Sequence, residues 1–343
     1  MLCLGIESTS HTIGLGIVDD DGNILANERS TLTTESGGIH PRKALEHHHL
    51  FFGLLLEKVF DTAKVKPSDI DLIAFSKGPG LGGTLRVSAA AARALATKLN
   101  IPLIGVNHPI AHIEIAKLTS GFKDPVILYV SGANTQIISL AAGRYRVAGE
   151  TLDIGIGNFL DAFGRYIGLG FPQGPKVEEL ASKSKTYIEL PYTIKGIDFS
   201  FSGILTNLKR ISSKYKPKLS KAKLGPAKQY VSLGKEDLCY STQETVFAIL
   251  TEAVERALAH LDKKELLVTG GVAANKRLGE MLNIMCKARG IKFHQVPREL
   301  SGDQGAMIAW LGILEHKAGR KQTLKQTEVD KNWRADEVDV IWT

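Results

Sequence analysis

The sequence predicts an α/β protein built from two similar lobes. Three observations support this: a strand-turn-strand pattern opens the chain, the same pattern returns near residue 121, and helical and strand patterns alternate after each copy. The two copies align Leu4-Gly5-Ile6 with Leu128-Tyr129-Val130. An internal repeat of this kind indicates two lobes of one architecture.

Length and hydrophobic content set the expected domain organisation. The chain has 343 residues, of which 43% are hydrophobic, so two domains of ordinary size can each bury a core. We expect an N-terminal lobe over 1–120 and a C-terminal lobe over 121–318. The remaining residues, 319–343, form a charged tail that we expect to add little to the core.

Charge and cysteine content narrow the classes of function. The chain carries 43 Lys and Arg against 36 Asp and Glu, a net charge of +7 that allows a polyanionic partner without requiring one. Three isolated cysteines, with no CxxC spacing, indicate neither a disulfide framework nor a thiolate zinc site. No apolar run is long enough to cross a membrane, so we expect a soluble, cytoplasmic protein.

In the first lobe, a hairpin begins at residue 2 and turns at the small polar residues Ser8 to Ser10. A helix is predicted from about Pro41 to Phe60, and a short strand from Leu72 to Phe75. The glycine-rich loop "KGPGLGG" then leads into an alanine-rich helix, and the strand "PLIGV" delivers the chain to His108.

In the second lobe, the hairpin turns at Ser131 to Thr135. A loop and helix region is expected over Thr151 to Ser184, followed by a lysine-rich stretch and a helix from about Ser241 to Leu261. The strand "ELLVT" and the segment "GGVAANKRLGEML", which enters another helix, complete this lobe.

Small residues at both hairpin turns are typical of anion binding, because they let a phosphate approach the backbone N–H groups closely. The turn at Gly270-Gly271 is a third such element, since it leads from a strand into a helix N-terminus. Two duplicated lobes and a late TGG loop are the plan of the actin, hexokinase and Hsp70 superfamily. Its members have duplicated RNase H-like domains with a nucleotide between the lobes.

His108 and His112 are spaced so that one helix could present both to a metal ion. Pro109 disfavours a helical conformation at the residue before it, so His108 is expected at the start of the helix. A zinc protease would carry HExxH, but no acid lies between these histidines, which excludes that class. The spacing alone leaves open a metal site or two packed histidines.

Eight motifs together resemble the universal tRNA threonylcarbamoyladenosine-synthesis family, which supplies the catalytic subunit of the archaeal and eukaryotic KEOPS complex. The resemblance spans roughly residues 1 to 315. The motifs, in order, are "GIESTSHTIGLGI", "KGPGLGGTLRVSAAAARALA", "NHPIAHIEIA", "LYVSGANTQIISL", "TLDIGIGNFLDAFGRYIGLGFPQGPKVEELA", "FSFSGILTNL", "LLVTGGVAANKRL" and "SGDQGAMIAW".

This resemblance implies an enzyme that transfers a threonylcarbamoyl group from threonylcarbamoyl-AMP to N6 of the adenosine beside the anticodon, in tRNAs reading codons that begin with A. It implies one metal ion, with iron favoured and zinc possible. It also implies an adenine nucleotide or the adenylate, with Mg possible. The implied metal ligands are His108, His112, Tyr129 and Asp303.

The resemblance further implies a set of nucleotide-binding residues and no assigned general base. The loop from Tyr129 would contact phosphate and the others would recognise adenosine. In this sequence they are Tyr129, Val130, Ser131, Gly132 and Ala133 for phosphate, and Asp161, Gly174, Glu178 and Asn275 for adenosine.

Four residues depart from the usual pattern of the family: Ala133, Gln173, Ser301 and Gln304. Ala133 is the most consequential. If its position requires a positive φ, the methyl group costs of order 1 kcal/mol and narrows the phosphate site.

The implied partners are tRNA, a separate enzyme that makes the adenylate, and the KEOPS subunits: a kinase-like ATPase, a small dimerising subunit and a regulatory subunit. The segment 203–228 holds eight Lys and Arg and no acid, so it is either a solvated loop or a contact for tRNA phosphate. Two other classes stay open: a small-molecule kinase of the same superfamily and a non-catalytic nucleic-acid-binding subunit.

Overall fold

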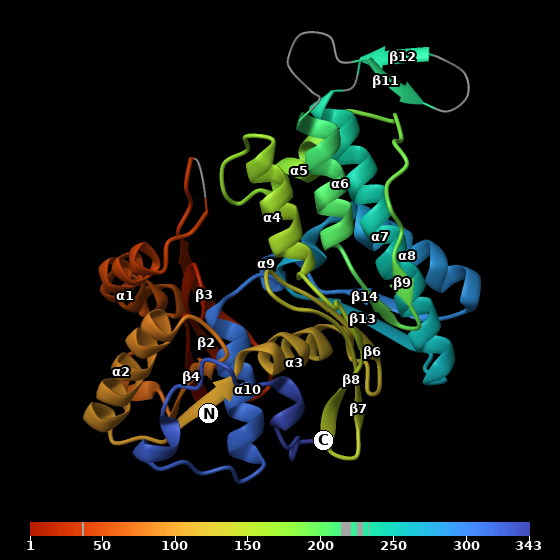
Figure 1. Cartoon of the computed structure of the whole chain (residues 1–343). Helices are drawn as coiled ribbons and strands as arrows, with labels where there is room; N and C mark the ends of the chain where they lie inside the picture. The colour runs from red at the N-terminus through yellow and green to blue at the C-terminus, as the bar shows by residue number, and fades with distance from the viewer. Residues whose placement is uncertain (36–37, 214–220, 225–228, 233) are drawn as a thin grey trace.

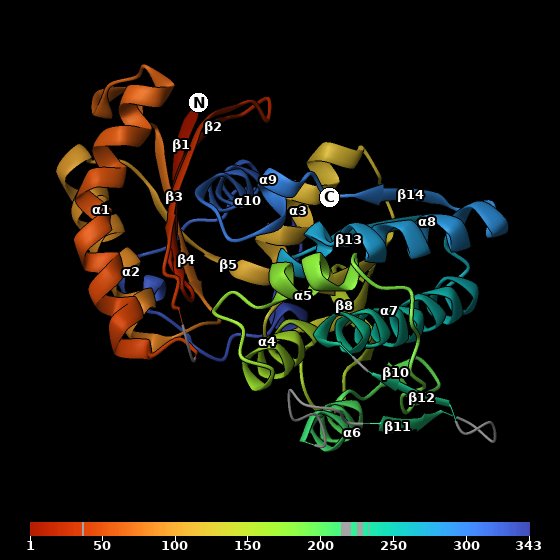
Figure 2. The same cartoon turned by 90° about the horizontal axis from the view of Figure 1, so that it is seen from above.

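The computed structural model describes residues 1–35, 38–213, 221–224, 229–232 and 234–343. Two five-stranded sheets lie in two lobes with helices around them (Figures 1 and 2). The residues whose placement is described thus confirm the α/β class and the two-lobed arrangement. The charged residues Lys214, Lys216 and Lys218 of the basic segment lie outside them.

The first sheet has the strand order β3-β2-β1-β4-β5. β1 pairs antiparallel with β2 and parallel with β4, while β2 pairs antiparallel with β3 and β4 parallel with β5. The strands are β1 (Leu2–Glu7), β2 (Thr12–Asp19), β3 (Ile24–Thr31), β4 (Leu72–Gly78) and β5 (Leu103–Asn107). The strand β3 has no counterpart among the predicted elements.

The second sheet repeats this topology strand for strand, in the order β8-β7-β6-β13-β14. β6 pairs antiparallel with β7 and parallel with β13, as β1 does with β2 and β4. The predicted duplication is therefore confirmed. The strands are β6 (Val126–Val130), β7 (Thr135–Ala141), β8 (Arg144–Glu150), β13 (Glu265–Thr269) and β14 (Lys292–Gln295).

Helices cover both faces of the first sheet. α1 (Pro41–Ala63) and α2 (Gly82–Leu99) enclose one apolar cluster against it. α10 (Gly305–Lys317) packs on β1, β2 and β4 from the other side, although the sequence places it in the proposed C-terminal lobe. The approach is close, because a Cβ on Gly5 would lie 2.2 Å from the carbonyl oxygen of Gly305.

The remaining helices surround the second sheet. α3 contacts β6 and β13, and α7 contacts β6 and β8. The helices are α3 (His108–Ser120), α4 (Ile156–Tyr166), α5 (Gly174–Ala181), α6 (Ser202–Ser213), α7 (Lys235–His260), α8 (Lys276–Arg289) and α9 (Arg298–Ser301). Two short hairpins flank α6: β9 (Ile194–Lys195) with β10 (Asp198–Phe199), and β11 (Lys221–Leu224) with β12 (Gln229–Ser232).

The larger apolar core is continuous between the lobes, because α3 and α10 contact each other at its centre. Its buried residues run from Cys3 in β1 to Val340 in the C-terminal tail. The two helices that carry or follow the predicted metal ligands are thus held where the lobes meet.

The C-terminal tail corrects one expectation. Ala335, Val338 and Val340 are buried, so the tail does add to the core. The side chain of Gln322 exchanges two hydrogen bonds with the backbone of Gly105, and the N–H of Val340 donates to the carbonyl of Gly143. Charge dominated the sequence pattern, and the three apolar side chains are too widely spaced to show a period.

Among the helices in the described part of the chain, none is both long and apolar enough to span a membrane.

Candidate metal centre and nucleotide site

His108 and His112 lie on consecutive turns at the start of α3. Asn107 caps this helix, accepting a hydrogen bond from the N–H of Ile110, and Pro109 occupies its first turn. His108 is therefore the first helical residue, as expected from Pro109. Both side chains are buried, and their ring centroids are 4.7 Å apart.

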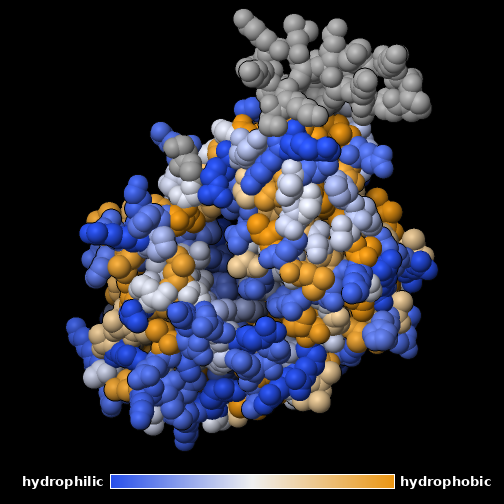
Figure 3. Space-filling view, viewed as in Figure 1, coloured by the Kyte–Doolittle hydropathy of each residue, from blue (hydrophilic) through white to orange (hydrophobic). Residues whose placement is uncertain are grey.

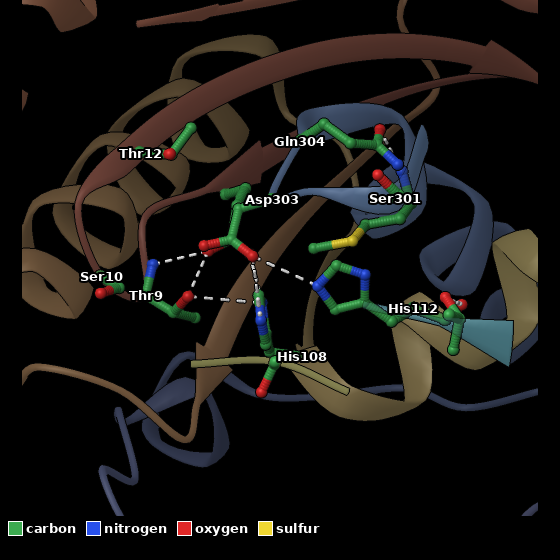
Figure 4. Close-up of polar contacts among 12 residues, drawn as sticks. Thr9, Ser10, Thr12, His108, His112, Ser301, Asp303 and Gln304 are labelled. Carbon is green, nitrogen blue, oxygen red and sulfur yellow. Dashed lines mark hydrogen bonds and ion pairs between the residues drawn. The ribbon is translucent and has the colours of Figure 1, made fainter. Parts of the chain in front are cut away.

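Asp303 reaches the histidines from the short loop between α9 and α10. Its Oδ1 lies 3.2 Å from Nε2 of His112 and 3.5 Å from Nε2 of His108. The side chain of Gln304 caps α10 by accepting from the N–H of Met307, which fixes the backbone beside Asp303. Figure 4 shows the three side chains converging from two elements.

These three residues form a donor set that fits a transition metal. One ligand atom from each lies within 4.8 Å of the others, and no second group of His, Cys, Asp or Glu in the described ranges does so. Two imidazole nitrogens and one carboxylate oxygen suit iron or zinc. The structure thus brings together three of the four predicted metal ligands, His108, His112 and Asp303.

Opposite charges face each other in this buried cluster. Burial favours the neutral ring of His108, but the carboxylates of Glu7 and Asp303 outweigh it and raise the pKa of His108 to about 9. Burial lowers the pKa of His112. Burial would raise the pKa of Asp303, but the two histidines hold it well below its usual range. An ionised Asp303 is the form that binds a cation.

Glu7 is a site residue that sequence reasoning missed. It ends β1, is fully buried, and places Oε2 2.9 Å from Nδ1 of His108. Its Oε1 accepts from both the N–H and the hydroxyl of Thr9, each at 2.6 Å. The available signal was an acid closing an otherwise apolar strand, directly before the first small-residue turn.

Tyr129 is buried near the end of β6, and its ring centroid is 5.6 Å from that of His112. Burial raises the pKa of its hydroxyl, and the nearby polar groups of Ser131 and Asn134 oppose this shift. The structure therefore brings Tyr129 beside a predicted metal ligand.

The second turn keeps two backbone donors open. The N–H of Ser131 donates to the carbonyl of Asn134, whereas those of Gly132 and Ala133 have no partner among the residues described. Two adjacent free amides suit an anion. Ala133 does not have a positive φ, so the cost considered for its methyl group does not arise.

In the first turn, some backbone N–H groups already donate to residues of the same lobe. The N–H of Ser8 donates to the Ser76 hydroxyl, and that of Thr9 donates to Glu7. Within the described chain, the amides of Ser10 and His11 have no such partner. Each turn thus offers two amides, and in the first turn the N–H of Thr9 donates to the Glu7 carboxylate beside the metal-ligand cluster.

The four residues expected at adenosine gather around α5. The N–H of Gln173, just before Gly174, donates to Oδ1 of Asp161, and burial raises the pKa of that carboxyl. Glu178 accepts from the N–H of Lys276 at 2.8 Å. Asn275 caps α8 and donates to Oε1 of Gln243.

A cavity of about 740 Å³ adjoins this group. It lies between α5, α7 and α8, and its lining includes Glu178, Gln243 and Lys276. Polar side chains also line the hollow between the two lobes (Figure 3). The described residues therefore provide a cluster that fits a metal ion, open turn amides and a cavity whose volume admits a nucleotide.

The family model of tRNA N6-adenosine threonylcarbamoyltransferase matches residues 23–310 of the chain.

The chain belongs to this threonylcarbamoyltransferase family.

It is accordingly an enzyme of tRNA threonylcarbamoyladenosine synthesis, and the family implies both a metal ion and a nucleotide.

Similar relatives come from archaea. A threonylcarbamoyltransferase of Thermococcus sibiricus is 55% identical over the whole of both chains, and one of Archaeoglobus fulgidus is 49% identical over the whole of both. A probable bifunctional tRNA threonylcarbamoyladenosine biosynthesis protein of Methanothermobacter thermautotrophicus is 51% identical; the match covers all of this chain and 61% of that one.

Solved structures agree on the fold. HypF of T. kodakarensis matches with a TM-score of 0.61 at 15% identity, over 96% of this chain and 49% of that one. Component A of (R)-2-hydroxyglutaryl-CoA dehydratase from Acidaminococcus fermentans has a TM-score of 0.55 at 14% identity, over 92% and 99%. The threonylcarbamoyltransferase fold of this chain is thus the duplicated, two-lobed fold expected for its superfamily.

Proposed function

We propose that this chain transfers the threonylcarbamoyl group of threonylcarbamoyl-AMP to N6 of the adenosine beside the anticodon, in tRNAs reading codons that begin with A. The observation that carries the proposal is the cluster of His108, His112 and Asp303. Thr9 of the first turn lies 3.4 Å from His108, and Tyr129, which precedes the second turn, packs beside His112. An acyl phosphate bound beside this cluster would contact the turns of both lobes.

The reaction asks for orientation more than for acid and base groups. The N6 amine attacks the carbamoyl carbon, a carbon–nitrogen bond forms, and the bond from that carbon to the phosphate oxygen breaks. The amine loses one proton and AMP leaves. Because the adenylate is already an activated mixed anhydride, positioning and charge stabilisation supply most of the acceleration. We assign no general base.

His108, His112 and Asp303 would hold one metal ion, and Tyr129 is proposed as a fourth ligand. These donors are compatible with both iron and zinc, and the family resemblance favours iron. When bound, the ion supplies Lewis-acid polarisation of a carbonyl oxygen.

The nucleotide is proposed to bind through the turn and α5. The amides of Gly132 and Ala133 contact phosphate, alongside Tyr129, Val130 and Ser131, with Mg as a possible counterion. Asp161, Gly174, Glu178 and Asn275 surround the adenosine. The open amides and the adjoining cavity support this assignment.

Partner surfaces follow from the same proposal. The chain acts as the catalytic subunit of KEOPS, with lobes over 1–120 and 121–318 and a tail over 319–343. Leu50 and Leu54 are 69% and 59% exposed on α1, a face suited to a partner subunit. The basic segment 203–228 is proposed to contact tRNA phosphate. Charge reversal of its lysines that leaves modification and its salt dependence unchanged would contradict this.

Reconstitution tests the function. The chain is combined with the adenylate-forming enzyme, the partner subunits, threonine, bicarbonate, ATP and a tRNA reading codons that begin with A, followed by nucleoside analysis. We expect threonylcarbamoyladenosine in the tRNA. Its absence from a correctly assembled complex would refute the proposal, and phosphorylation of a small metabolite that is insensitive to His112→Ala would indicate a kinase.

A further inference from the structure

We propose that Glu7 is a positioning residue that fixes the ring of His108 for metal binding and ties the first turn to the metal centre. This inference rests on the metal-dependent function proposed above. It assigns Glu7 no contact with substrate or metal, and its effect passes through His108.

Both oxygens of the Glu7 carboxylate are committed. Oε2 lies 2.9 Å from Nδ1 of His108, and Oε1 accepts the two hydrogen bonds from Thr9. The side chain has no exposed surface, so water does not compensate its charge. A buried carboxylate is stable only with such partners, and here they join a turn to a metal-ligand helix.

The contact determines which nitrogen of His108 is free. An ionised carboxylate can only accept, so Nδ1 carries the proton and donates to Oε2. When the ring gives up its second proton to bind an ion, that proton leaves from Nε2, which lies 3.5 Å from Oδ1 of Asp303 and then has its lone pair available. A carboxylate that orients a metal-binding histidine in this way also makes the ring a stronger ligand.

His112 has no equivalent support. Its Nδ1 is buried, and no hydrogen-bond partner for it occurs in the described part of the chain. Of the two histidines, only His108 is therefore held in one tautomer by a carboxylate. Figure 4 shows Thr9 beside His108, where the turn and the metal centre meet. Loss of this support should weaken the whole centre.

Glu7→Gln is the sharpest variant, because it keeps the size of the side chain and changes its donors. If the amide oxygen keeps the two Thr9 bonds, its NH₂ group points at Nδ1. That nitrogen must then accept, and the proton moves to Nε2, the position needed by the metal. We expect Zn²⁺ to bind about 10- to 100-fold more weakly, measured by titration of the full chain against a chelating dye.

Glu114→Gln is the matched control. Glu114 lies on α3 and is also buried, but its carboxylate accepts from the Tyr145 hydroxyl at 2.5 Å rather than contacting a histidine. We expect this variant to bind Zn²⁺ as the unmodified chain does. Co²⁺ absorption bands provide the second readout: they change in Glu7→Gln and stay the same in Glu114→Gln.

Glu7→Asp tests the chemistry if the first variant folds poorly. It keeps a carboxylate that can accept from Nδ1, so its folded fraction should bind Zn²⁺ more tightly than Glu7→Gln does. Unchanged Zn²⁺ affinity and Co²⁺ bands in Glu7→Gln, or the reverse order of the two Glu7 variants, would overturn the inference. These readouts need no tRNA, so failure of the proposed reaction is detected separately.

Discussion

Glu315 is a buried acid on α10 that the proposed reaction does not use. Arg320 lies 3.1 Å away as an ion pair, but neither carboxylate oxygen accepts a hydrogen bond from the residues that the structure describes. Burial raises the pKa of Glu315 to about 7, against the nearby charges of Arg320 and Lys77. In the folded chain, Glu315 is therefore mostly protonated below about pH 7 and ionised above it.

This predicts a pH-dependent difference between the chain and Glu315→Gln. Between the ordinary glutamate pKa of 4.5, which applies to the unfolded chain, and the folded pKa of about 7, the folded state binds more protons than the unfolded state. Stability is consequently lost as pH rises through this window, by up to about 3 kcal/mol relative to Glu315→Gln. Urea unfolding of both proteins at a series of pH values measures it, and parallel stability curves would contradict it.

At the scale of residues, the sequence predicted the site where the residue types and their spacing form a distinctive motif. His108, His112 and Asp303 were expected to meet and do so. Glu7 was missed, because one acid after an apolar strand has no spacing to mark it. Its role depends on a contact with a residue 101 positions away, which only the fold creates.

At the scale of elements, Asn275 at the N-terminus of α8 has two roles: it caps the helix, and it is proposed to bind adenosine. Oδ1 of Asn275 accepts from the N–H groups of Arg277 and Leu278. Both Asn275→Ala and Asn275→Ser remove the donor to Gln243. Because only Asn275→Ser keeps a capping oxygen, the free energy of unfolding should be about 1 kcal/mol lower for Asn275→Ala than for Asn275→Ser. Chemical denaturation compares the two variants.

A measurement of nucleotide affinity distinguishes the capping role of Asn275 from its proposed role in adenosine recognition. If the Asn275 amide contacts the adenosine, Asn275→Ser should weaken adenine-nucleotide binding although it keeps a capping oxygen for α8. Isothermal titration measures the affinity. Unchanged nucleotide affinity in a folded Asn275→Ser protein would contradict a role of Asn275 in adenosine binding.

Elements with strong local signals were predictable, and those defined by pairing were not. Pro109 indicated the start of α3 correctly. β3 was missed because its apolar positions are sparse, and it forms by pairing with β2. α7 begins at Lys235, before the expected Ser241, because Asp237 caps its N-terminus with a hydrogen bond from the N–H of Gly234.

At the scale of the whole molecule, the tail holds the two lobes together. Gln322 contacts β5 of the first sheet, and Asp339 forms an ion pair with Arg144 in β8 of the second. Val338 and Val340 bury their side chains in the larger apolar core. The tail is thus part of the junction at which the metal centre lies.

Removal of 320–343 should therefore destabilise the chain. Loss of two buried valines alone costs roughly 3 kcal/mol or more, seen as a lower midpoint in thermal unfolding. Asp339→Asn is the control, since an exposed ion pair contributes less than about 1 kcal/mol. A truncated chain as stable as this control would contradict the assigned role.

The sequence showed the duplication of the two lobes, but it did not show how the two lobes pack together. Matching hairpins signal two sheets, whereas the packing of α10 on the first sheet depends on close backbone contacts at Gly5, Gly16 and Gly305. Because glycine has no side chain, such contacts produce no hydrophobic pattern in the sequence. The metal centre lies at this joint, where both lobes contribute.

Transfer from preformed threonylcarbamoyl-AMP to tRNA in a single turnover tests the central claim most directly. We expect Asp303→Ala and His112→Ala, assembled with the same partner subunits, to lose bound metal and to transfer at least about 100-fold more slowly than the unmodified chain. Transfer by metal-free Asp303→Ala at the unmodified rate would contradict the proposed role of the metal centre.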